Sequence, residues 1–281
     1  MQSLVIVPTY NEIANLKPLV TAILAVDPCV HVLVVDDGSP DGTGACADEI
    51  AARTPRVRVM HRPGKLGLGT AYIAGFRYAL ARGYDRIVQM DADFSHRPED
   101  LPRLLRASAQ ADLVVGSRNV PGGRAEHWSL LRHAISRGGS LYARLLLGLP
   151  IKDCTSGFKC FRREALAAID LDRVASNGYG FQVEMNYLCY RMGLRLIEVP
   201  IVFPDRVAGR SKMSGPIVGE AATVVWRLRR EGERRMRGRA RSTVSRTPAV
   251  PSIAAHARLV SSTGAVGALP ARAVDVEATH R

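Results

Sequence analysis

Two aspartates one residue apart, Asp91 and Asp93, have the chemistry of a divalent-metal site. They follow directly on the run Ile87-Val-Gln-Met90, whose mostly apolar composition is typical of a buried strand. On extended backbone, residues i and i+2 point the same way, so the two carboxylates can offer oxygen ligands to one cation. A solvated turn that leads into a helix near Pro98 is the alternative interpretation, because Asp and Ser also fill turns and cap helices.

The elements around the acidic pair alternate regularly along the chain. Apolar, β-branched runs predict strands, and the segments between the first five of them predict helices. The expected strands are residues 4–7, 31–35, 57–60, 87–90, 112–115, 159–161 and 195–199. This alternation predicts an α/β fold with a mostly parallel, Rossmann-like sheet, flanking helices and right-handed crossovers.

Such a topology brings polar clusters together at one edge of the sheet, because ligands of open α/β sheets bind beyond the carboxyl ends of the strands. Residues 9–12, 36–39, 91–95 and Arg118 all occupy that position. Their convergence favours a binding site over a chance turn for the acidic pair. The glycine-rich segment 64–70 also leads into a helix and can receive phosphate; a plain strand-to-helix loop is the alternative, since it matches no established phosphate motif.

Beyond Arg118 the alternation stops, and the stretches 128–137 and 141–149 both predict helical structure, with apolar residues at near-helical spacing. Arg132 and Ser136 would lie one turn apart on the first of them. Together they can hold a phosphate beside an apolar surface, although an ordinary amphipathic helix is the alternative.

Composition limits the class of protein. The chain has 281 residues and a formal charge of +13, but the stretch from Arg227 onward holds twelve arginines against four acids, so the preceding part is only mildly basic. No window approaches the roughly 18 apolar residues of a membrane span, no secretory signal is visible, and no nucleic-acid-binding module is recognised. Five widely spaced cysteines without a Cys-x-x-Cys pair indicate reduced thiols in or near the core. A cytosolic protein that does not bind nucleic acid is expected.

The C-terminal region divides into two parts. Pro216 is placed to begin an amphipathic, basic helix over residues 216–238, in which Ile217, Ala221, Val224 and Leu228 form one apolar stripe. This stripe can pack on the sheet or lie on a membrane surface. Residues 239–281 have no periodicity and predict a disordered tail rich in Arg and Ala.

Taken together, the motifs resemble those of the inverting family-2 glycosyltransferases of GT-A fold, and within them the polyprenyl (dolichyl) phosphate mannose synthases. The resemblance covers roughly residues 3–226, so residues 1–215 are expected to form the catalytic domain. It depends on the segments Val7-Pro-Thr-Tyr-Asn-Glu12, 35–43, 65–70, Asp91-Ala-Asp-Phe-Ser-His96, 116–118, 156–158, 178–182 and 205–212. The Ser-His ending of 91–96 is more similar to the mannose synthases than to their glucosyl relatives.

The resemblance implies a role for individual residues. The residues expected around the guanine nucleotide of the donor are Pro8, Tyr10, Glu12, Asp37 and Lys65. Those expected to hold Mg²⁺ or Mn²⁺ on its diphosphate are Asp91, Asp93 and Ser95. Donor phosphates are assigned to Arg118, Arg206 and Lys212, and the acceptor phosphate to Arg132 and Ser136. Asp93, Arg118 and Arg206 are expected to carry catalysis.

The activity implied is transfer of mannose from GDP-mannose to a polyprenyl phosphate, with inversion, by a peripheral protein at the cytosolic face of a membrane. A phosphate oxygen is already anionic near neutral pH, so no essential general base is expected and His96 is assigned a structural role. The mannose synthases of soluble type lack membrane helices and rely on a membrane partner or on surface contact. The resemblance is therefore compatible with a membrane-anchoring partner protein for this chain. Transfer of glucose or another hexose to the same lipid, and a catalytically silent protein that binds nucleotide sugars, are the alternatives.

Overall fold

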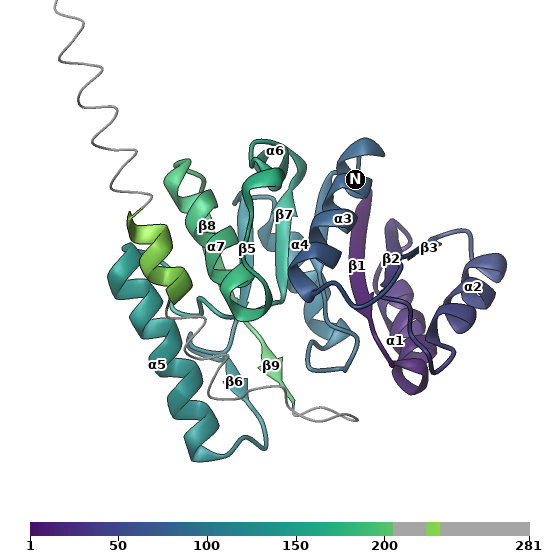
Figure 1. The fold of residues 1–281 in the computed structure, drawn as a ribbon, viewed down its shortest axis with the longest axis horizontal. Helices are drawn as coiled ribbons and strands as arrows, with labels where there is room; N and C mark the ends of the chain where they lie inside the picture. Colours follow the sequence, from purple (N-terminus) through teal and green to yellow (C-terminus); the bar gives the residue numbers. More distant parts are fainter. Residues whose placement is uncertain (205–222, 231–281) are drawn as a thin grey trace, which may run out of the picture. The chain divides into compact units, whose positions relative to one another are not determined.

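The apolar runs form the strands of one seven-stranded sheet in the computed structural model of the protein, which describes residues 1–204 and 223–230. Its strands are β1 (Ser3–Thr9), β2 (Val30–Asp36), β3 (Val57–His61), β4 (Arg86–Gln89), β5 (Leu113–Ser117), β7 (Lys159–Arg162) and β8 (Leu196–Pro200). Two short strands, β6 (Arg124–Ala125) and β9 (Val202–Phe203), pair with each other beside it (Figure 1). The predicted α/β fold is confirmed.

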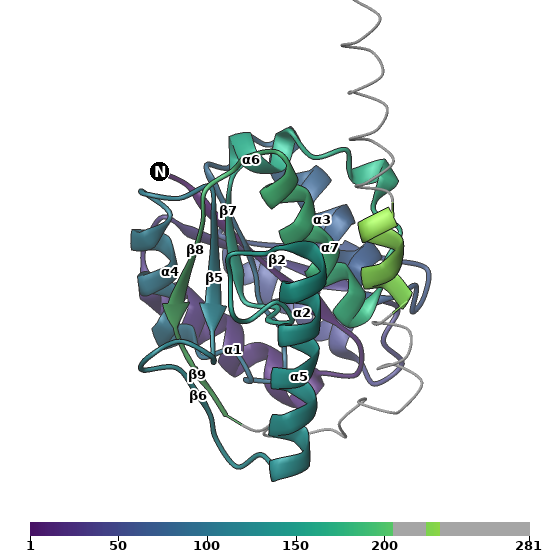
Figure 2. The same ribbon diagram turned by 90° about the vertical axis from the view of Figure 1, so that its left-hand side faces the viewer.

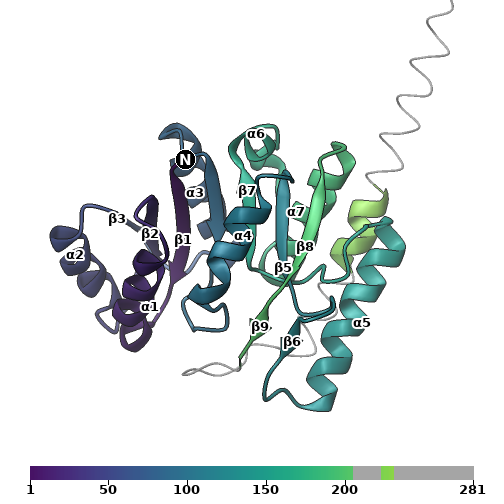
Figure 3. The same cartoon turned by 180° about the vertical axis from the view of Figure 1, so that it is seen from behind.

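Helices cover both faces of this sheet. They are α1 (Ile13–Val26), α2 (Thr43–Arg53), α3 (Leu68–Ala81), α4 (Leu101–Ala107), α5 (Leu130–Leu147), α6 (Arg163–Ala167) and α7 (Gly178–Arg191), with 3-10 turns η1 (Pro98–Asp100) and η2 (Leu171–Arg173). Successive side chains of a strand point to opposite faces, so Leu4 and Ile6 pack with α3 and α7 while Val5 and Val7 pack with α1 and α4. Figure 2 shows α3 and α7 on one side of the strands and α4 on the other, and Figure 3 shows the face with α1 and α4.

The order of the strands is β3-β2-β1-β4-β7-β5-β8. Every neighbouring pair is parallel except the two that involve β7, which runs antiparallel to both β4 and β5. A mostly parallel sheet was expected, and β7 is its single reversed strand. Because β7 lies between β4 and β5, it separates the acidic loop after β4 from Arg118, which follows β5. The residues that precede β7 lie at the same edge of the sheet as these strand ends.

The expectation that residues 128–137 and 141–149 are helical is confirmed over most of both stretches, which one continuous helix, α5, joins. Its first turn is capped by Ser129, whose hydroxyl accepts a hydrogen bond from the Arg132 backbone N–H. Glycines at 138 and 139 weaken a helix but do not end it, and buried Ala143 and Leu147 hold the second half on the core. The helix ends at Gly148, whose φ of +67° suits glycine.

The C-terminal helix predicted over 216–238 is described only at residues 223–230, where the chain is helical. There Val224 and Leu228, two members of the predicted apolar stripe, are buried in the core cluster that contains α3 and α7. The stripe therefore packs on the protein in this part. The tail 239–281 lies outside the described residues.

None of the helices in the described part of the chain combines the length and apolar character that crossing a membrane requires. The five cysteines are free thiols. Three of them are buried, as expected, but Cys29 is exposed on the surface.

Candidate active site

A cavity of about 420 Å³ lies at the carboxyl ends of β2, β1 and β4. Seven residues with predicted roles line it: Pro8, Tyr10, Glu12, Asp37, Lys65, Asp91 and Asp93. They come from three separate strand ends and from the loop before α3. The strand order explains why they meet, because β1 lies between β2 and β4 and the three are parallel.

The β2 side of the cavity is held by hydrogen bonds between loops. Asp36 accepts hydrogen bonds from the hydroxyls of Thr9 (3.0 Å) and Ser39 (2.6 Å), which ties the end of β1 to the end of β2. Burial raises the pKa of the neighbouring Asp37, and its ion pair with Arg62 (3.0 Å) acts in the opposite direction. Across the cavity mouth the Lys65 ammonium lies 4.3 Å from the centre of the Tyr10 ring. This part of the cavity therefore combines the aromatic ring of Tyr10 with the positive charge of Lys65 and the carboxyl group of Asp37.

Asp91 and Asp93 line the same cavity, but not on extended backbone as the sequence suggested. Strand β4 ends at Gln89, and the chain then bends, with Phe94 at a φ of +60°. The Asp91 backbone N–H donates to His96 Nδ1 (3.0 Å), and an Asp93 carboxylate oxygen accepts from the Ser95 backbone N–H (3.1 Å). The loop thus folds back on itself and presents both carboxylates to the cavity.

Tyr72 fixes one oxygen of Asp91. Its hydroxyl donates to Asp91 Oδ1 (2.8 Å) from the interior of α3. Helix α3 can lie that close because of Gly75, where a Cβ would be only 2.6 Å from the Ile6 side chain. Complete burial, reinforced by the charge of Asp91, raises the pKa of Tyr72 well above its ordinary value, so the hydroxyl remains a donor.

Replacing Tyr72 by phenylalanine is expected to weaken binding of a divalent cation about 10-fold, because a hydrogen bond that orients a ligating carboxylate contributes to metal affinity. Titration calorimetry with Mn²⁺ in the presence of GDP measures the effect. Tyr190→Phe is the matched control, since Tyr190 is a partly exposed tyrosine of α7 that does not line the cavity. Equal Mn²⁺ affinities of Tyr72→Phe and the control would show that this hydrogen bond has no part in metal binding.

The acidic pair fits a hard divalent cation. Within residues 1–204 and 223–230, no third His, Cys, Asp or Glu is grouped with the pair as a protein ligand. Mg²⁺-type sites commonly use one or two carboxylates and complete their coordination with phosphate and water, so two carboxylates in an open cavity are sufficient. Ser95 is buried and does not line the cavity, so its assignment as a ligand stays a prediction.

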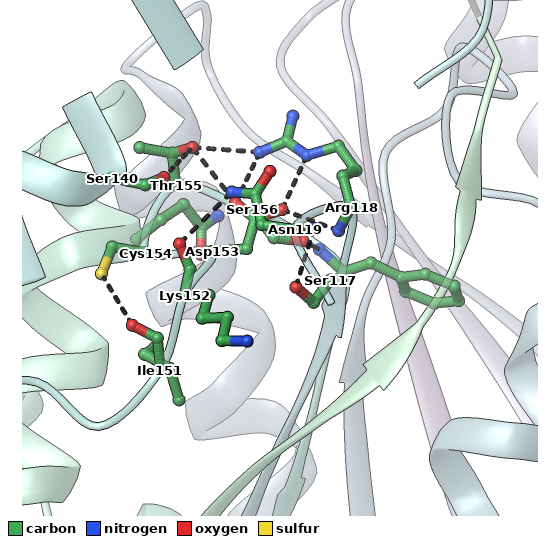
Figure 4. Close-up of polar contacts among 12 residues, drawn as sticks. Ser117, Arg118, Asn119, Ser140, Ile151, Lys152, Asp153, Cys154, Thr155 and Ser156 are labelled. Carbon is green, nitrogen blue, oxygen red and sulfur yellow. Dashed lines mark hydrogen bonds and ion pairs between the residues drawn. The ribbon is translucent and has the colours of Figure 1, made fainter. Parts of the chain in front are cut away.

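Arg118 lies outside this cavity, on the far side of β7. Its guanidinium donates two hydrogen bonds to the carboxylate of buried Asp153 (2.8 and 2.7 Å) and one to the Thr155 hydroxyl (3.0 Å), as Figure 4 shows. Burial alone would raise the pKa of Asp153, but the charge and hydrogen bonds of Arg118 outweigh it and hold that pKa below the ordinary value. Through Thr155, which lines the first cavity, the pair is connected to that cavity.

The predicted acceptor-phosphate residues gather near Arg118. Ser136 and Arg118 line one small recess together with Trp128, and the Arg132 guanidinium lies 4.1 Å from the Trp128 ring centre. The Arg118 guanidinium lies 5.3 Å from the same ring. Three of the predicted phosphate-binding side chains are therefore grouped around one tryptophan. Arg206 and Lys212 lie outside the described residues.

Sequence reasoning assigned no role to the opposite wall of the first cavity. This wall is formed by Thr155, Gly157, Asn177, Gly178, Tyr179, Gly180 and Gln182. The signal was present in the motifs 156–158 and 178–182, but nothing in these residue types indicates a ligand. The position of Thr155 and Gly157 follows from the reversal of β7, which brings the segment before it to the ligand-binding edge, whereas the residues of α7 are held there by contacts such as that of Phe181 with Tyr72.

Residues 4–170, more than half of the chain, match the protein family described as Glycosyl transferase family 2. The chain belongs to this family.

Two curated members of the family are similar over most of their length. An undecaprenyl-phosphate mannosyltransferase of Micrococcus luteus is 56% identical over 227 residues, which cover 81% of this chain and 93% of that protein. A polyprenol monophosphomannose synthase of Mycolicibacterium smegmatis is 51% identical over 232 residues, covering 81% and 88%. The resemblance found in the sequence motifs is confirmed.

Solved structures of glycosyltransferases share the fold. Glucosyl-3-phosphoglycerate synthase from Mycobacterium tuberculosis, in complex with Mn²⁺, UDP and phosphoglyceric acid, superposes with a TM-score of 0.58 at 22% identity, covering 80% of this chain and 76% of that one. The mannosyltransferase PcManGT from Pyrobaculum calidifontis, in complex with GDP-Man and Mn²⁺, gives a TM-score of 0.52 at 17% identity, covering 89% and 76%. The family-2 domain therefore has the GT-A fold that was expected.

Proposed function

We propose that this family-2 glycosyltransferase transfers mannose from GDP-mannose to a polyprenyl phosphate, with inversion at the anomeric carbon. The observation that carries the proposal is the 56% identity, over 93% of its length, to a protein named undecaprenyl-phosphate mannosyltransferase. The geometry supports it, because seven of the residues predicted to hold the nucleotide and its metal line one cavity. Ser136, predicted for the acceptor phosphate, lines a recess with Arg118, whose partner Thr155 lines that cavity.

The leaving group is a nucleoside diphosphate, whose charge grows as the sugar–phosphate bond breaks. Asp91 and Asp93 would hold Mg²⁺ or Mn²⁺, which when bound neutralises part of that charge. The side chains of the protein bind and orient the donor. Tyr72 orients Asp91, and Tyr10 and Lys65 offer a ring and a cation to the nucleotide. Arg206 and Lys212 are proposed to contact the donor phosphates as well.

The nucleophile is an oxygen of the acceptor phosphate, which is already anionic, so the site has to position it rather than remove a proton. Arg132 and Ser136 are proposed for this task beside Trp128, and Arg118, proposed for the donor phosphates, lies against the same ring. His96 is not placed to act as a base. Its Nδ1 accepts the Asp91 backbone N–H, burial lowers its pKa, and its ring stacks on Phe158, 5.0 Å between centres.

A lipid acceptor requires an apolar surface near the phosphate site, and the beginning of α5 offers one. Leu130 and Leu131 are 88% and 71% exposed, and Leu145 on the same helix is 70% exposed. Arginines interleave with them, as suits a surface that meets anionic headgroups. We infer a peripheral position at the cytosolic face of the membrane, held by α5, by the arginine-rich C-terminal region and by a membrane-anchoring partner protein.

The purified protein with labelled GDP-mannose, Mg²⁺ and a short polyprenyl phosphate is expected to form a labelled lipid that mild acid cleaves to release mannose. UDP-glucose in place of GDP-mannose is expected to label the lipid at least about 100-fold more slowly, because the site is proposed to recognise both base and sugar. Proton NMR of the product distinguishes a β- from an α-linkage. Labelling from UDP-glucose alone would refute the donor assignment, and an α-linked product would refute inversion.

A further inference from the structure

Gln182, in the second turn of α7, has an unusual environment for a buried amide. Its side chain lines the first cavity and the residue is only 3% exposed. Neither its Nε2 nor its Oε1 has a hydrogen-bond partner in the described part of the protein. A buried amide left without partners is costly, so such a group needs an explanation. A ligand in the cavity that both accepts and donates hydrogen bonds would supply one.

The backbone of this residue is held firmly. The ammonium of Lys159, a fully buried residue at the start of β7, donates a hydrogen bond to the Gln182 carbonyl oxygen (2.7 Å). Two residues earlier, Gly180 packs closely against Val224, where a Cβ would be 3.1 Å from a valine methyl. The main chain is therefore fixed on two sides while the amide faces the cavity. This arrangement is preorganised for a ligand rather than for the core.

Gly157 keeps the space between Gln182 and the acidic pair open. A Cβ at this position would lie 3.4 Å from Gln182 Nε2 and 3.6 Å from Asp91 Oδ2. Both groups are thus directed to the same small region of the cavity. A group of the ligand that fills this region can contact the Gln182 amide on one side. A phosphate attached to that group can then reach the carboxylates of Asp91 and Asp93 on the other side.

The order of the strands indicates which part of the donor lies there. Moving across the sheet, the nucleotide residues follow β2 and β1, the acidic pair follows β4, and the wall with Gln182 lies at β7 and α7. In a nucleotide sugar the diphosphate connects the nucleoside to the hexose. With the diphosphate at Asp91 and Asp93, the hexose extends away from the nucleoside, toward β7 and the acceptor residues beyond it.

We propose that the Gln182 carboxamide binds hydroxyl groups of the donor hexose and contributes to the choice of sugar. This inference rests on the proposed function. A neutral amide with one acceptor and two donor hydrogens suits hydroxyls, whereas phosphates are bound chiefly by cations. The residue recognises the sugar, and the metal-holding pair binds the diphosphate independently of it.

Donor analogues test this assignment directly. GDP-mannose and its 2-, 3-, 4- and 6-deoxy forms are compared as donors for the wild type and for Gln182→Met, which keeps the side-chain length and removes the hydrogen bonds. With the intact donor, kcat/KM is expected to fall roughly 10- to 100-fold in the variant. At least one deoxy donor is expected to be used poorly by the wild type, with that discrimination reduced to within about threefold in Gln182→Met.

Two controls keep the result specific. Gln89→Met changes another buried glutamine whose amide has no partner among the described residues, but which does not line the cavity, so it is expected to keep the wild-type discrimination. Affinity for GDP with Mg²⁺, measured by calorimetry, is expected to stay within about twofold in Gln182→Met. Unchanged discrimination in Gln182→Met would overturn the inference, as would a loss of GDP affinity equal to the loss of kcat/KM.

A second variant covers the case in which Gln182→Met fails to fold. Gly157→Ala places a methyl group between the Gln182 amide and Asp91. This variant is expected to have a lower kcat/KM for the intact donor and an unchanged affinity for GDP. An equal kcat/KM in this variant and the wild type would also count against the inference. Failure of the proposed function gives a different result. A wild type that transfers another hexose refutes the mannose assignment, and the deoxy series of that hexose then tests Gln182.

Discussion

Replacing Asp93 by asparagine is expected to lower the rate of mannosyl transfer by about 1000-fold or more, with the fold intact. The carboxylate lines the cavity beside Asp91, and these two are the acidic side chains at the end of β4 that can hold a cation. The asparagine side chain has nearly the same shape as aspartate, so the hydrogen bond from the Ser95 backbone N–H can still form, but it carries no charge. The loss therefore falls on metal and diphosphate binding rather than on packing.

Transfer is measured under saturating donor with Mg²⁺ or Mn²⁺, and Mn²⁺ affinity in the presence of GDP is measured by calorimetry. Asp172→Asn is the matched control, because Asp172 is an exposed aspartate that forms a surface ion pair with Arg77 and does not line the cavity. It is expected to behave as the wild type in both measurements. Retained transfer in Asp93→Asn would remove this carboxylate from the metal site, whereas lost transfer with unchanged Mn²⁺ affinity would assign it a different role.

The parts of the site that follow local patterns could be predicted from the sequence. Parallel strands have their carboxyl ends at one edge, so polar residues after β1, β2 and β4 had to converge once the strands were recognised. Tyr10 and Asp91 were predicted in this way, and both line the cavity. The extended geometry expected for the acidic pair was wrong, yet the pair remained together because the loop after β4 folds back through Ser95 and His96.

The parts that depend on distant contacts could not be predicted. Gln182 looks like any polar residue of a helix, and its place at the cavity depends on contacts of α7 with distant elements, such as Phe181 against Tyr72 and the Lys159 ammonium on the Gln182 carbonyl. Nothing near Arg118 in the sequence identifies its partner, because Asp153 is 35 residues away and comes from the segment between α5 and β7. The sequence indicated helix on both sides of Gly138 and Gly139 but not that the two stretches join into one α5, because two adjacent glycines favour a break unless tertiary packing holds the helix.

Removing the partner of Arg118 is expected to have the largest effect on stability. Asp153→Asn should lower the free energy of unfolding by about 3–5 kcal/mol, because it leaves a buried guanidinium without its counter-charge. The Asp153 carboxylate accepts two hydrogen bonds from the Arg118 side chain, one from the Arg118 backbone N–H (2.9 Å) and one from the Thr155 hydroxyl (3.4 Å). The Asp153 backbone N–H donates to Glu198 (2.9 Å). Urea denaturation measures the loss. Asp170→Asn, which breaks the exposed pair with Arg173, is expected to cost less than about 1 kcal/mol.

The pH dependence of this difference tests its electrostatic origin. Arg118 holds the pKa of Asp153 below its ordinary value of 3.8, so the pair's contribution is fully present above that pH and is lost as the pH falls through the lowered pKa. The stability gap between the wild type and Asp153→Asn should therefore stay constant from neutral pH down to about 4 and narrow below it. A double replacement, Arg118→Met with Asp153→Leu, should recover part of the lost stability, since no charge is then left buried. A gap that does not depend on pH, with no recovery in the double variant, would show that Asp153 stabilises the protein through packing alone.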